Sequence, residues 1–287
     1  MNGTCIYQKI TELACELGFT ASGVAPAAPL REEFSHYLTA MEEGCFADME
    51  YLKRNCNLRR DPRQLFEGGK SLLLFLAPYG EKSAAPERDI RFQDGSHGSY
   101  KVASYALGRD YHKVIKKRLS AILDYIKREL PGAEGRVFTD SAPILERAWG
   151  VRAGLGFIGK NNFLINREVG IRNFIGVIIS NVEFAPVFDM ALYKNYCGEC
   201  RRCIESCPTG ALSPFRVDAS RCISYLTIEK REGGIELNRE LAEERDGWIF
   251  GCDACMNACP WNGFNRQGWS EFNPQPGSIP AAHLHRR

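Results

Sequence analysis

The sequence lacks the features of a membrane-spanning or a uniformly basic protein. No apolar run approaches the roughly 20 residues of a transmembrane helix; the longest, 71–79 and 173–180, have the length of buried strands. The chain does not open with a basic region, an apolar core and a cleavage site, nor with twin arginines, so we expect a cytoplasmic protein. Because the net charge is only +2, any nucleic-acid site must be a local basic patch.

Cysteine, in contrast, is abundant and clustered. Four cysteines lie in the run CGECRRCIESCP at 197–208, followed directly by proline. Bacterial two-cluster ferredoxins hold 4Fe–4S clusters with cysteines at these spacings. A second run, CDACMNACP at 252–260, repeats the motif without its first cysteine, because position 249 is Ile249. The isolated Cys222 can supply the missing thiolate.

Eight cysteines therefore form two sets of four, which indicates one-electron transfer through two adjacent clusters. In two-cluster ferredoxins the fourth cysteine of a run binds the other cluster. This crossing predicts Cys197, Cys200, Cys203 and Cys259 for one cluster, and Cys207, Cys222, Cys252 and Cys255 for the other. Structural zinc is the alternative, since zinc sites also use CxxC pairs. Four cysteines within eleven residues, and proline after the fourth, favour iron–sulfur.

Helical and strand-like patterns are intermixed over residues 1–190, which predicts an α/β or α+β sandwich domain. The polar stretch 81–99 predicts a long loop. Helices are expected at 4–17, 111–130 and 142–153. Strands are expected at 21–25, 72–77, 136–139, 163–166 and 173–182, the last two close enough for a hairpin.

Two shorter regions complete the predicted domain organisation. Residues 191–262 should form a ferredoxin-like domain whose loops are held by the clusters, with little apolar core of its own. Residues 263–287 are rich in proline, and we expect a poorly ordered tail.

Two motifs resemble cofactor sites without their required context. GLGFIG at 154–159 matches the dinucleotide fingerprint GxGxxG, but a helix is predicted before it and a strand after it, which is the reverse of the required order. We therefore expect a turn in which backbone segments approach closely. Asp110-Tyr111-His112 resembles the start of DxHxxG, which places a histidine on cobalt; the final glycine is replaced by Ile115, so we expect an ordinary histidine near a helix start.

Several segments together resemble the epoxyqueuosine reductase family. They are 105–115, 139–165, 197–212, 218–231 and 250–262, and the likeness covers about 1–262. The resemblance implies an N-terminal α/β domain that binds base-off cobalamin, followed by a ferredoxin-like domain with two 4Fe–4S clusters. It also implies an oxidoreductase that converts epoxyqueuosine to queuosine in a tRNA anticodon loop, with electrons from a low-potential donor of flavodoxin or ferredoxin type.

The resemblance also assigns residues. Asp140 matches the family's proton donor, a role that requires a raised pKa; judged by its neighbours alone, Asp140 would be the N-cap of the helix expected at 142–153. Leu164 and Ile175 are equally compatible with core positions, and Arg60 with the surface. The positions matching cobalamin contacts are Arg60, Asp140, Lys160, Asn161, Leu164, Ile175 and Ser224. Candidate tRNA contacts are the basic groups at 113–118, 201–202 and 230–231.

Two other functions are compatible with the same motifs. One is a cobalamin and iron–sulfur reductase of a small molecule, similar to reductive dehalogenases, and the other is a non-catalytic electron carrier of ferredoxin type. Many members of the resembled family continue into a helical-repeat domain that helps to bind tRNA. This chain ends about 25 residues after Asn262 and resembles a short form without that domain.

Overall fold

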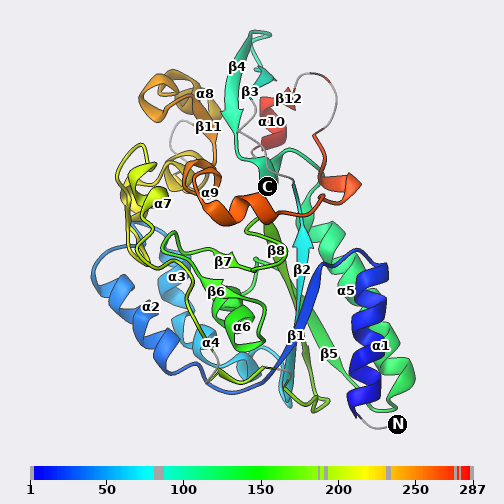
Figure 1. Cartoon of the computed structure of the whole chain (residues 1–287). Coiled ribbons are helices and arrows are strands. Elements are labelled where there is room, and N and C mark those ends of the chain that lie inside the picture. The colour runs from blue at the N-terminus through cyan, green and yellow to red at the C-terminus, as the bar shows by residue number, and fades with distance from the viewer. Residues whose placement is uncertain are drawn as a thin grey trace.

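A four-stranded antiparallel sheet forms the centre of the molecule (Figure 1). The computed structural model describes residues 3–80, 87–186, 188–190, 193–230, 234–274, 277 and 279–284. The strands of the central sheet, in spatial order, are β1 (Ala21–Pro26), β2 (Ser71–Pro78), β8 (Asn173–Ser180) and β5 (Gly135–Phe138). Every residue of β2 is buried, as its uninterrupted apolar sequence predicts.

Helices cover both faces of this sheet, which makes a three-layer sandwich. Alternate residues of β2 point to opposite faces. Leu73 and Phe75 join the core formed with α1 (Gly3–Glu16) and α5 (Tyr111–Glu129), whereas Leu72 and Leu74 join the core formed with α6 (Glu146–Arg152). The mixed α and β architecture expected for this region is confirmed.

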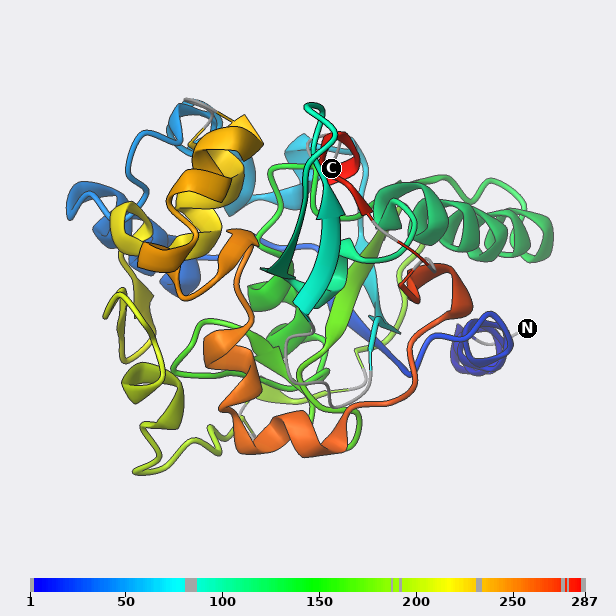
Figure 2. The same cartoon turned by 90° about the horizontal axis from the view of Figure 1, so that it is seen from above.

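The remaining elements are short and surround the sandwich. Figure 2 shows α1 and α5 on one side of the central sheet, with the segments that bear the cysteine runs on the other. The short helices are α2 (Glu32–Glu42), α3 (Glu50–Arg54), α4 (Cys56–Arg60), α7 (Arg202–Glu205), α8 (Gly234–Glu240), α9 (Ala254–Asn257) and α10 (Ala281–Leu284). The short strand pairs are β6 (Phe157–Ile158) with β7 (Leu164–Ile165), and β9 (Leu212–Ser213) with β10 (Arg216–Val217). No helix among the described residues is both long and apolar enough to cross a bilayer.

A second sheet differs from the sequence prediction. Within the stretch expected to be a loop, β3 (Glu87–Arg91) and β4 (His97–Val102) form an antiparallel hairpin, while 81–86 lie outside the described residues. Strands β11 (Trp248–Phe250) and β12 (Ile279–Pro280) flank the hairpin on its two edges. The hairpin buries few of its own side chains, and its apolar partners are the neighbouring Ala106 and Leu107 and residues of the distant segments 228–250 and 279–284.

The hairpin expected between the two late strands is also wrong. β7 pairs with β6, whereas β8 lies between β2 and β5 in the central sheet. The apolar sequence of β8 explains this position, because a strand whose residues 176–180 are all buried needs cover on both faces and hydrogen-bonded neighbours on both edges.

The segment after the second cysteine run is built into the core, although the sequence predicted little order there. Trp269 and Phe272 are 7% and 2% exposed. The indole Nε1 of Trp269 donates a hydrogen bond of 2.7 Å to the carbonyl of Gly18, and the guanidinium of Arg118 lies 3.6 Å above the Trp269 ring. Two large aromatic side chains thus attach this segment to α1 and α5.

A buried ion pair joins the sheet to the second cysteine run. Arg172 and Asp253 have side chains that are 0% and 4% exposed, and their Nη1 and Oδ2 atoms are 3.1 Å apart. The Nε of Arg172 donates to Asn262 at 2.9 Å, and its two terminal nitrogens donate to Ser104 and Asn257. One guanidinium therefore holds four segments together.

We predict that Arg172→Met lowers the free energy of unfolding by about 3–5 kcal/mol, because it leaves the Asp253 carboxylate buried without its partner. Urea unfolding of the reconstituted protein, followed by circular dichroism, measures this loss. Lys53→Met is the matched control, since Lys53 is 38% exposed in an ion pair with Glu50 on the surface. An equal loss in the two variants would contradict the prediction.

Candidate functional site

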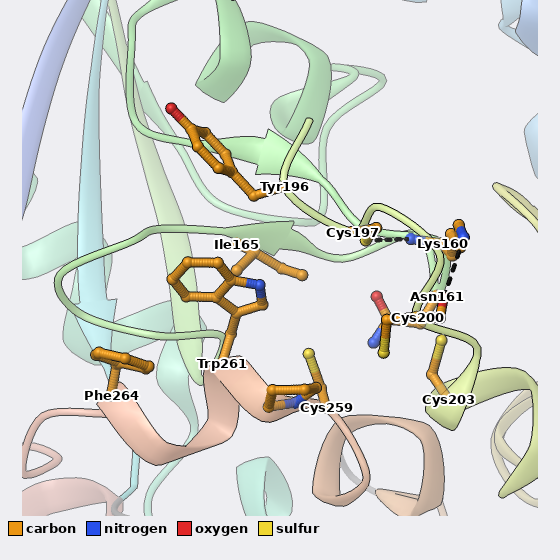
Figure 3. Close-up of a pocket in the computed structure, with 11 residues that line it drawn as sticks. Lys160, Asn161, Ile165, Tyr196, Cys197, Cys200, Cys203, Cys259, Trp261 and Phe264 are labelled. Carbon is orange, nitrogen blue, oxygen red and sulfur yellow. Dashed lines mark hydrogen bonds between the residues drawn. The ribbon is translucent and has the colours of Figure 1, made fainter. Parts of the chain in front are cut away.

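The structure brings the first predicted set of cysteines together around one cavity. Cys197, Cys200, Cys203 and Cys259 line a cavity of about 220 Å³ (Figure 3). The first three come from the loop before α7 and from α7 itself, and Cys259 follows α9. The other lining residues are Lys160, Asn161, Ile165, Tyr196, Pro260, Trp261 and Phe264.

The second set of cysteines also gathers in one place. Burial is the main cause that raises the pKa of the Cys252 thiol to about 12, and the charges of Cys222 and Cys207 contribute to the same shift. Burial likewise raises the pKa of Cys255, on which Cys252, Cys222 and Cys207 also act. In the first set, burial raises the pKa of Cys259 to about 11. Thiolates at such positions need a cationic partner, which the iron of a cluster supplies.

Backbone N–H groups point at several of these sulfurs. Lys160 N lies 3.4 Å from Cys197 Sγ, Ala211 N lies 3.3 Å from Cys207 Sγ, and Ala254 N lies 3.5 Å from Cys252 Sγ. Hydrogen bonds to sulfur stabilise negative charge and tune the reduction potential of an iron–sulfur cluster. The donor set therefore fits two 4Fe–4S clusters.

Two residues that match cobalamin contacts lie at the cysteine loops. The Nζ of Lys160 donates to the carbonyls of Gly198 at 2.6 Å and Cys200 at 3.0 Å. Asn161 is buried, and its Nδ2 donates to the carbonyl of Cys255 at 3.4 Å. These two side chains connect the glycine turn of the sandwich to both cysteine runs.

The other residues that match cobalamin contacts of the family lie in separate parts of the structure. Leu164 is 7% exposed and contacts Gly150, so it is a core residue. Ile175 is half-buried in β8, and Arg60 is exposed at the end of α4. Ser224 directly precedes the helical turn Tyr225–Glu229.

Asp140 lies at the centre of a hydrogen-bond network. The Tyr111 hydroxyl donates to Asp140 Oδ2, and His112 Nε2 lies 3.5 Å from the same oxygen. The backbone N–H of Asp140 donates to Glu146 Oε1 at 2.8 Å. Asp140 has a φ of +56°, a left-handed conformation that aspartate tolerates better than most residues. The network fixes both the backbone and the carboxylate of Asp140.

The interpretation of Asp140 as a helix N-cap is wrong. α6 begins at Glu146 and its N-cap is Leu145, several residues after Asp140. Pro143 removes one backbone donor from the intervening turn, and the Asp140 carboxylate is directed to Tyr111 and His112 instead. The carboxylate is 64% exposed and so is accessible to a bound molecule.

The protonation pattern also differs from the prediction of a raised pKa at Asp140. The hydrogen bond from His112 holds the pKa of Asp140 below its usual value, although desolvation opposes this. The same contact raises the pKa of His112. Desolvation raises the pKa of Glu146 to about 8, and the charge of Asp140 adds to this effect. The shifts therefore favour protonation of His112 and Glu146 over protonation of Asp140.

Further polar groups approach Asp140 from α3 and α4. Desolvation raises the pKa of Tyr51 to about 12, and both Glu229 and Asp140 act on the Tyr51 phenol. The Nε of Arg59 is buried and has no acceptor among the described residues. An orphaned buried donor near a cluster of polar groups suits a bound molecule that carries acceptors. The amide side chains of a corrin offer such acceptors, so these residues fit cobalamin.

Sequence patterns do not reveal most of this network. They do not single out Tyr111, Glu146, Tyr51 or Arg59, and for His112 they favour an ordinary histidine near a helix start. One signal existed: Asp110 caps α5 by accepting the backbone N–H of His112, which fixes the first turn of that helix. That the turn faces the end of β5 is a tertiary feature that sequence patterns do not contain.

Both motifs have the local structure that their sequence context predicted, a helix start at His112 and a turn at the glycines. His112 Nδ1 lies 3.0 Å from Asp110 Oδ1 and its Nε2 faces Asp140, so both ring nitrogens have partners. Gly156 has a φ of +149°, and a Cβ there would lie 2.1 Å from the carbonyl oxygen of Ile165. The glycine turn thus permits the close approach of two backbone segments, as its context predicted.

Comparison with known proteins gives family matches at both halves of the chain. A 4Fe-4S double cluster binding domain matches residues 196–262, and the family described as epoxyqueuosine reductase QueG, DUF1730, matches residues 59–141. The epoxyqueuosine reductase of Leadbetterella byssophila is 39% identical to this chain over 268 residues, which cover 93% of this chain and 83% of that protein.

Solved structures give the same result. An epoxyqueuosine reductase with an epoxyqueuosine-modified tRNA-Tyr stem loop matches with a TM-score of 0.79 and 26% identity, covering 96% of this chain and 70% of the other. The Bacillus subtilis epoxyqueuosine reductase, with its aspartate catalytic loop swung out of the active site, matches with a TM-score of 0.77 and 26% identity over the same shares.

Proposed function

The chain belongs to the epoxyqueuosine reductase family, and from this premise we propose that it reduces epoxyqueuosine to queuosine in the anticodon loop of a tRNA. The observation that carries the proposal is that two cysteine sets and the Asp140 network occur together in a chain 39% identical to a named epoxyqueuosine reductase. Loss of the epoxide oxygen as water, with formation of an alkene, consumes two electrons and two protons. Clusters held by the two cysteine sets would supply the electrons, and the Asp140 network would supply the protons.

The electron path runs through two 4Fe–4S clusters. Cys197, Cys200, Cys203 and Cys259 hold one, and Cys207, Cys222, Cys252 and Cys255 hold the other. The turn Tyr225–Glu229 follows Cys222 of the second set; its Tyr225 hydroxyl donates to Asp48, and Glu229 and Asp140 both act on the Tyr51 phenol. Clusters held by the two sets would supply one-electron transfer.

Base-off cobalamin would lie beside Asp140, where it supplies a strongly reducing cobalt centre that protein side chains cannot provide. Arg59 would donate its orphaned Nε–H to a corrin amide, and Tyr51 would contact the same molecule. Arg60, Ile175 and Ser224 are further candidate contacts. His112 is not a cobalt ligand in this proposal, because both of its ring nitrogens are engaged.

Asp140 is the proposed proton donor to the epoxide oxygen. The His112–Asp140 pair holds one proton between two sites, and its titration belongs to the pair. As negative charge develops on the leaving oxygen, Asp140 Oδ2 accepts the proton of His112 and passes it to that oxygen. The Bacillus subtilis relative, whose catalytic loop carries an aspartate, supports this role.

The first turns of α5 are the proposed contact with tRNA phosphates. Lys113 is 87% exposed, and the Nζ of Lys116 lies 3.1 Å from Ser141 Oγ, next to Asp140. Two cations at the edge of the site would attract the phosphates that flank the modified nucleotide. Arg118 on the same helix has a structural role instead, because it stacks on Trp269 and pairs with Glu271.

We predict that the anaerobically purified protein, with reconstituted clusters and added cobalamin, shows the EPR signal of base-off cob(II)alamin and converts epoxyqueuosine in tRNA to queuosine. Nucleoside analysis after incubation with a low-potential reductant measures the conversion. Failure to bind cobalamin would leave a ferredoxin-type carrier. Cobalamin binding with unchanged nucleoside would favour a reductase of small molecules.

Asp140→Asn should lower the single-turnover rate by a factor of about 10²–10⁴, because it removes the general acid. The visible and EPR spectra of the clusters and cobalamin should not change. Tyr111→Phe is the matched control, since it removes one hydrogen bond to the same carboxylate and leaves the acid in place. A normal rate in Asp140→Asn would refute the donor role.

The pH at which the single-turnover rate falls on the alkaline side should depend on the pKa of His112. Because contact with Asp140 raises the pKa of His112, the wild-type pair keeps its proton to a higher pH than a free histidine and loses it as the pH rises through that raised value. In His112→Gln the pair is reduced to the Asp140 carboxyl, which loses its proton at lower pH than histidine, so the alkaline fall in rate moves to lower pH. Single-turnover rates across the titration range of histidine measure this shift. His36→Gln, at an exposed position of α2, should leave the profile unchanged.

A further inference from the structure

The large apolar side chains exposed by the described part of the chain are concentrated near the first cysteine cavity. Six such side chains are exposed, and two of them, Tyr196 and Phe264, line that cavity. Phe215 is held next to it, because its backbone N–H donates to the carbonyl of Lys160 at 3.0 Å, and Tyr193 precedes Tyr196 by three residues. Exposed apolar patches of this kind mark interaction surfaces.

An aromatic cluster extends from this surface to the cysteines. The ring centroids of Phe157 and Tyr196 are 5.5 Å apart, those of Phe157 and Trp261 are 5.7 Å apart, and those of Trp261 and Phe264 are 5.4 Å apart. Figure 3 shows Trp261 beside Cys259, with Tyr196 and Phe264 in the same pocket. We call Tyr196, Trp261, Phe264 and Phe215, with the neighbouring Arg167 and Lys194, the aromatic face.

Positive charge surrounds the aromatic face. Residues 160–168 and 194–202 contain five Lys or Arg against two Glu, although the whole chain has a net charge of only +2. The guanidinium of Arg167 lies 4.4 Å from the centre of the Tyr196 ring and donates to its hydroxyl at 3.1 Å, and Lys194 Nζ lies 5.5 Å from the same ring. The charges are thus held on the aromatic surface, where they favour a negatively charged partner.

The position of this face along the electron path identifies the kind of partner. The two cysteine runs adjoin, because the hydroxyl of Ser206, next to Cys207, donates to the carbonyl of Ala254, next to Cys255, at 3.4 Å. The first set lies next to the surface, since the exposed Tyr196 and Phe264 line its cavity. Substrate must reach Asp140, whereas electrons must arrive from outside, and the first set is accessible to a carrier at the surface.

We propose that the aromatic face is the docking surface of an acidic, low-potential one-electron carrier protein. The inference rests on the proposed function, since it assumes clusters at both cysteine sets. Each docking event transfers one electron: the carrier is oxidised, the first cluster is reduced, and no covalent bond forms or breaks. Aromatic contacts provide apolar burial at the centre, and Arg167 and Lys194 steer the acidic carrier.

The test compares two reductants on the cluster-loaded protein. Arg167→Glu combined with Lys194→Glu should slow cluster reduction by a reduced flavodoxin on the order of 10-fold, and should remove most of its dependence on ionic strength. Reduction by methyl viologen, which is small and cationic, should not slow, and binding of epoxyqueuosine tRNA should not weaken. Bleaching of the cluster absorbance in a stopped-flow instrument measures both reductions. The control is Lys127→Glu with Arg128→Glu at the far end of α5, where Arg128 is 69% exposed.

Three results would overturn the proposal: an unchanged rate with flavodoxin, an equal loss with both reductants, or weakened binding of tRNA. The last result would assign the aromatic face to the RNA. Cluster reduction requires neither cobalamin nor epoxyqueuosine, so the test stands even if the protein fails to convert epoxyqueuosine.

Discussion

The buried ion pair between Arg172 and Asp253 determines how the two parts of the molecule fit together. Arg172 directly precedes β8 in the central sheet, and Asp253 directly follows Cys252 in the second cysteine run. Both side chains are almost fully withdrawn from water, where an unpaired charge would be strongly unfavourable. Any displacement of the cysteine run relative to the sheet would separate these charges. The pair therefore specifies one relative placement, which hydrogen bonds from Arg172 to Asn257 and Asn262 reinforce.

This placement gives the two ends of the proposed reaction separate environments. At the cysteine end, the sulfurs receive backbone N–H groups and lie beneath aromatic side chains. At the other end, Asp140 is surrounded by ionisable groups from α3, α5 and α6. The turn Tyr225–Glu229 lies between them and is itself anchored, because the Tyr225 hydroxyl donates to Asp48. Electrons and protons can therefore be supplied from different sides.

Local sequence patterns predict those elements whose structure depends mainly on residues close together in the sequence. The uninterrupted apolar run of β2 and the helical spacing of α5 predicted both elements to within one or two residues. The cysteine spacing identified all four residues that meet at the first cavity, including Cys259, which is more than 50 residues from its partners. Metal-ligand spacing is informative because the geometry of the cluster, rather than of the chain, dictates it.

The features that the sequence did not predict depend on contacts between distant segments. Strands β3 and β4 have weak patterns of their own, and their outer edges pair with the distant β11 and β12. Trp269 lies in the segment after the second cysteine run, and its partners are the distant Gly18 and Arg118. The expected pKa of Asp140 was wrong for the same reason, because His112 reaches it from another element.

The distribution of protons around Asp140 changes the way in which its role is understood. A single carboxylic acid with a raised pKa would hold one proton, but epoxide reduction to an alkene and water requires two. Here contact with Asp140 raises the pKa of His112, and desolvation is the main cause that raises the pKa of Glu146 to about 8. His112 contacts the carboxylate of Asp140, and Glu146 accepts its backbone N–H. Because the pKa of Asp140 itself is lowered, Asp140 is better placed to transfer protons than to store them. In the proposed reaction, two clusters that carry single electrons are thus matched by two side chains that carry single protons.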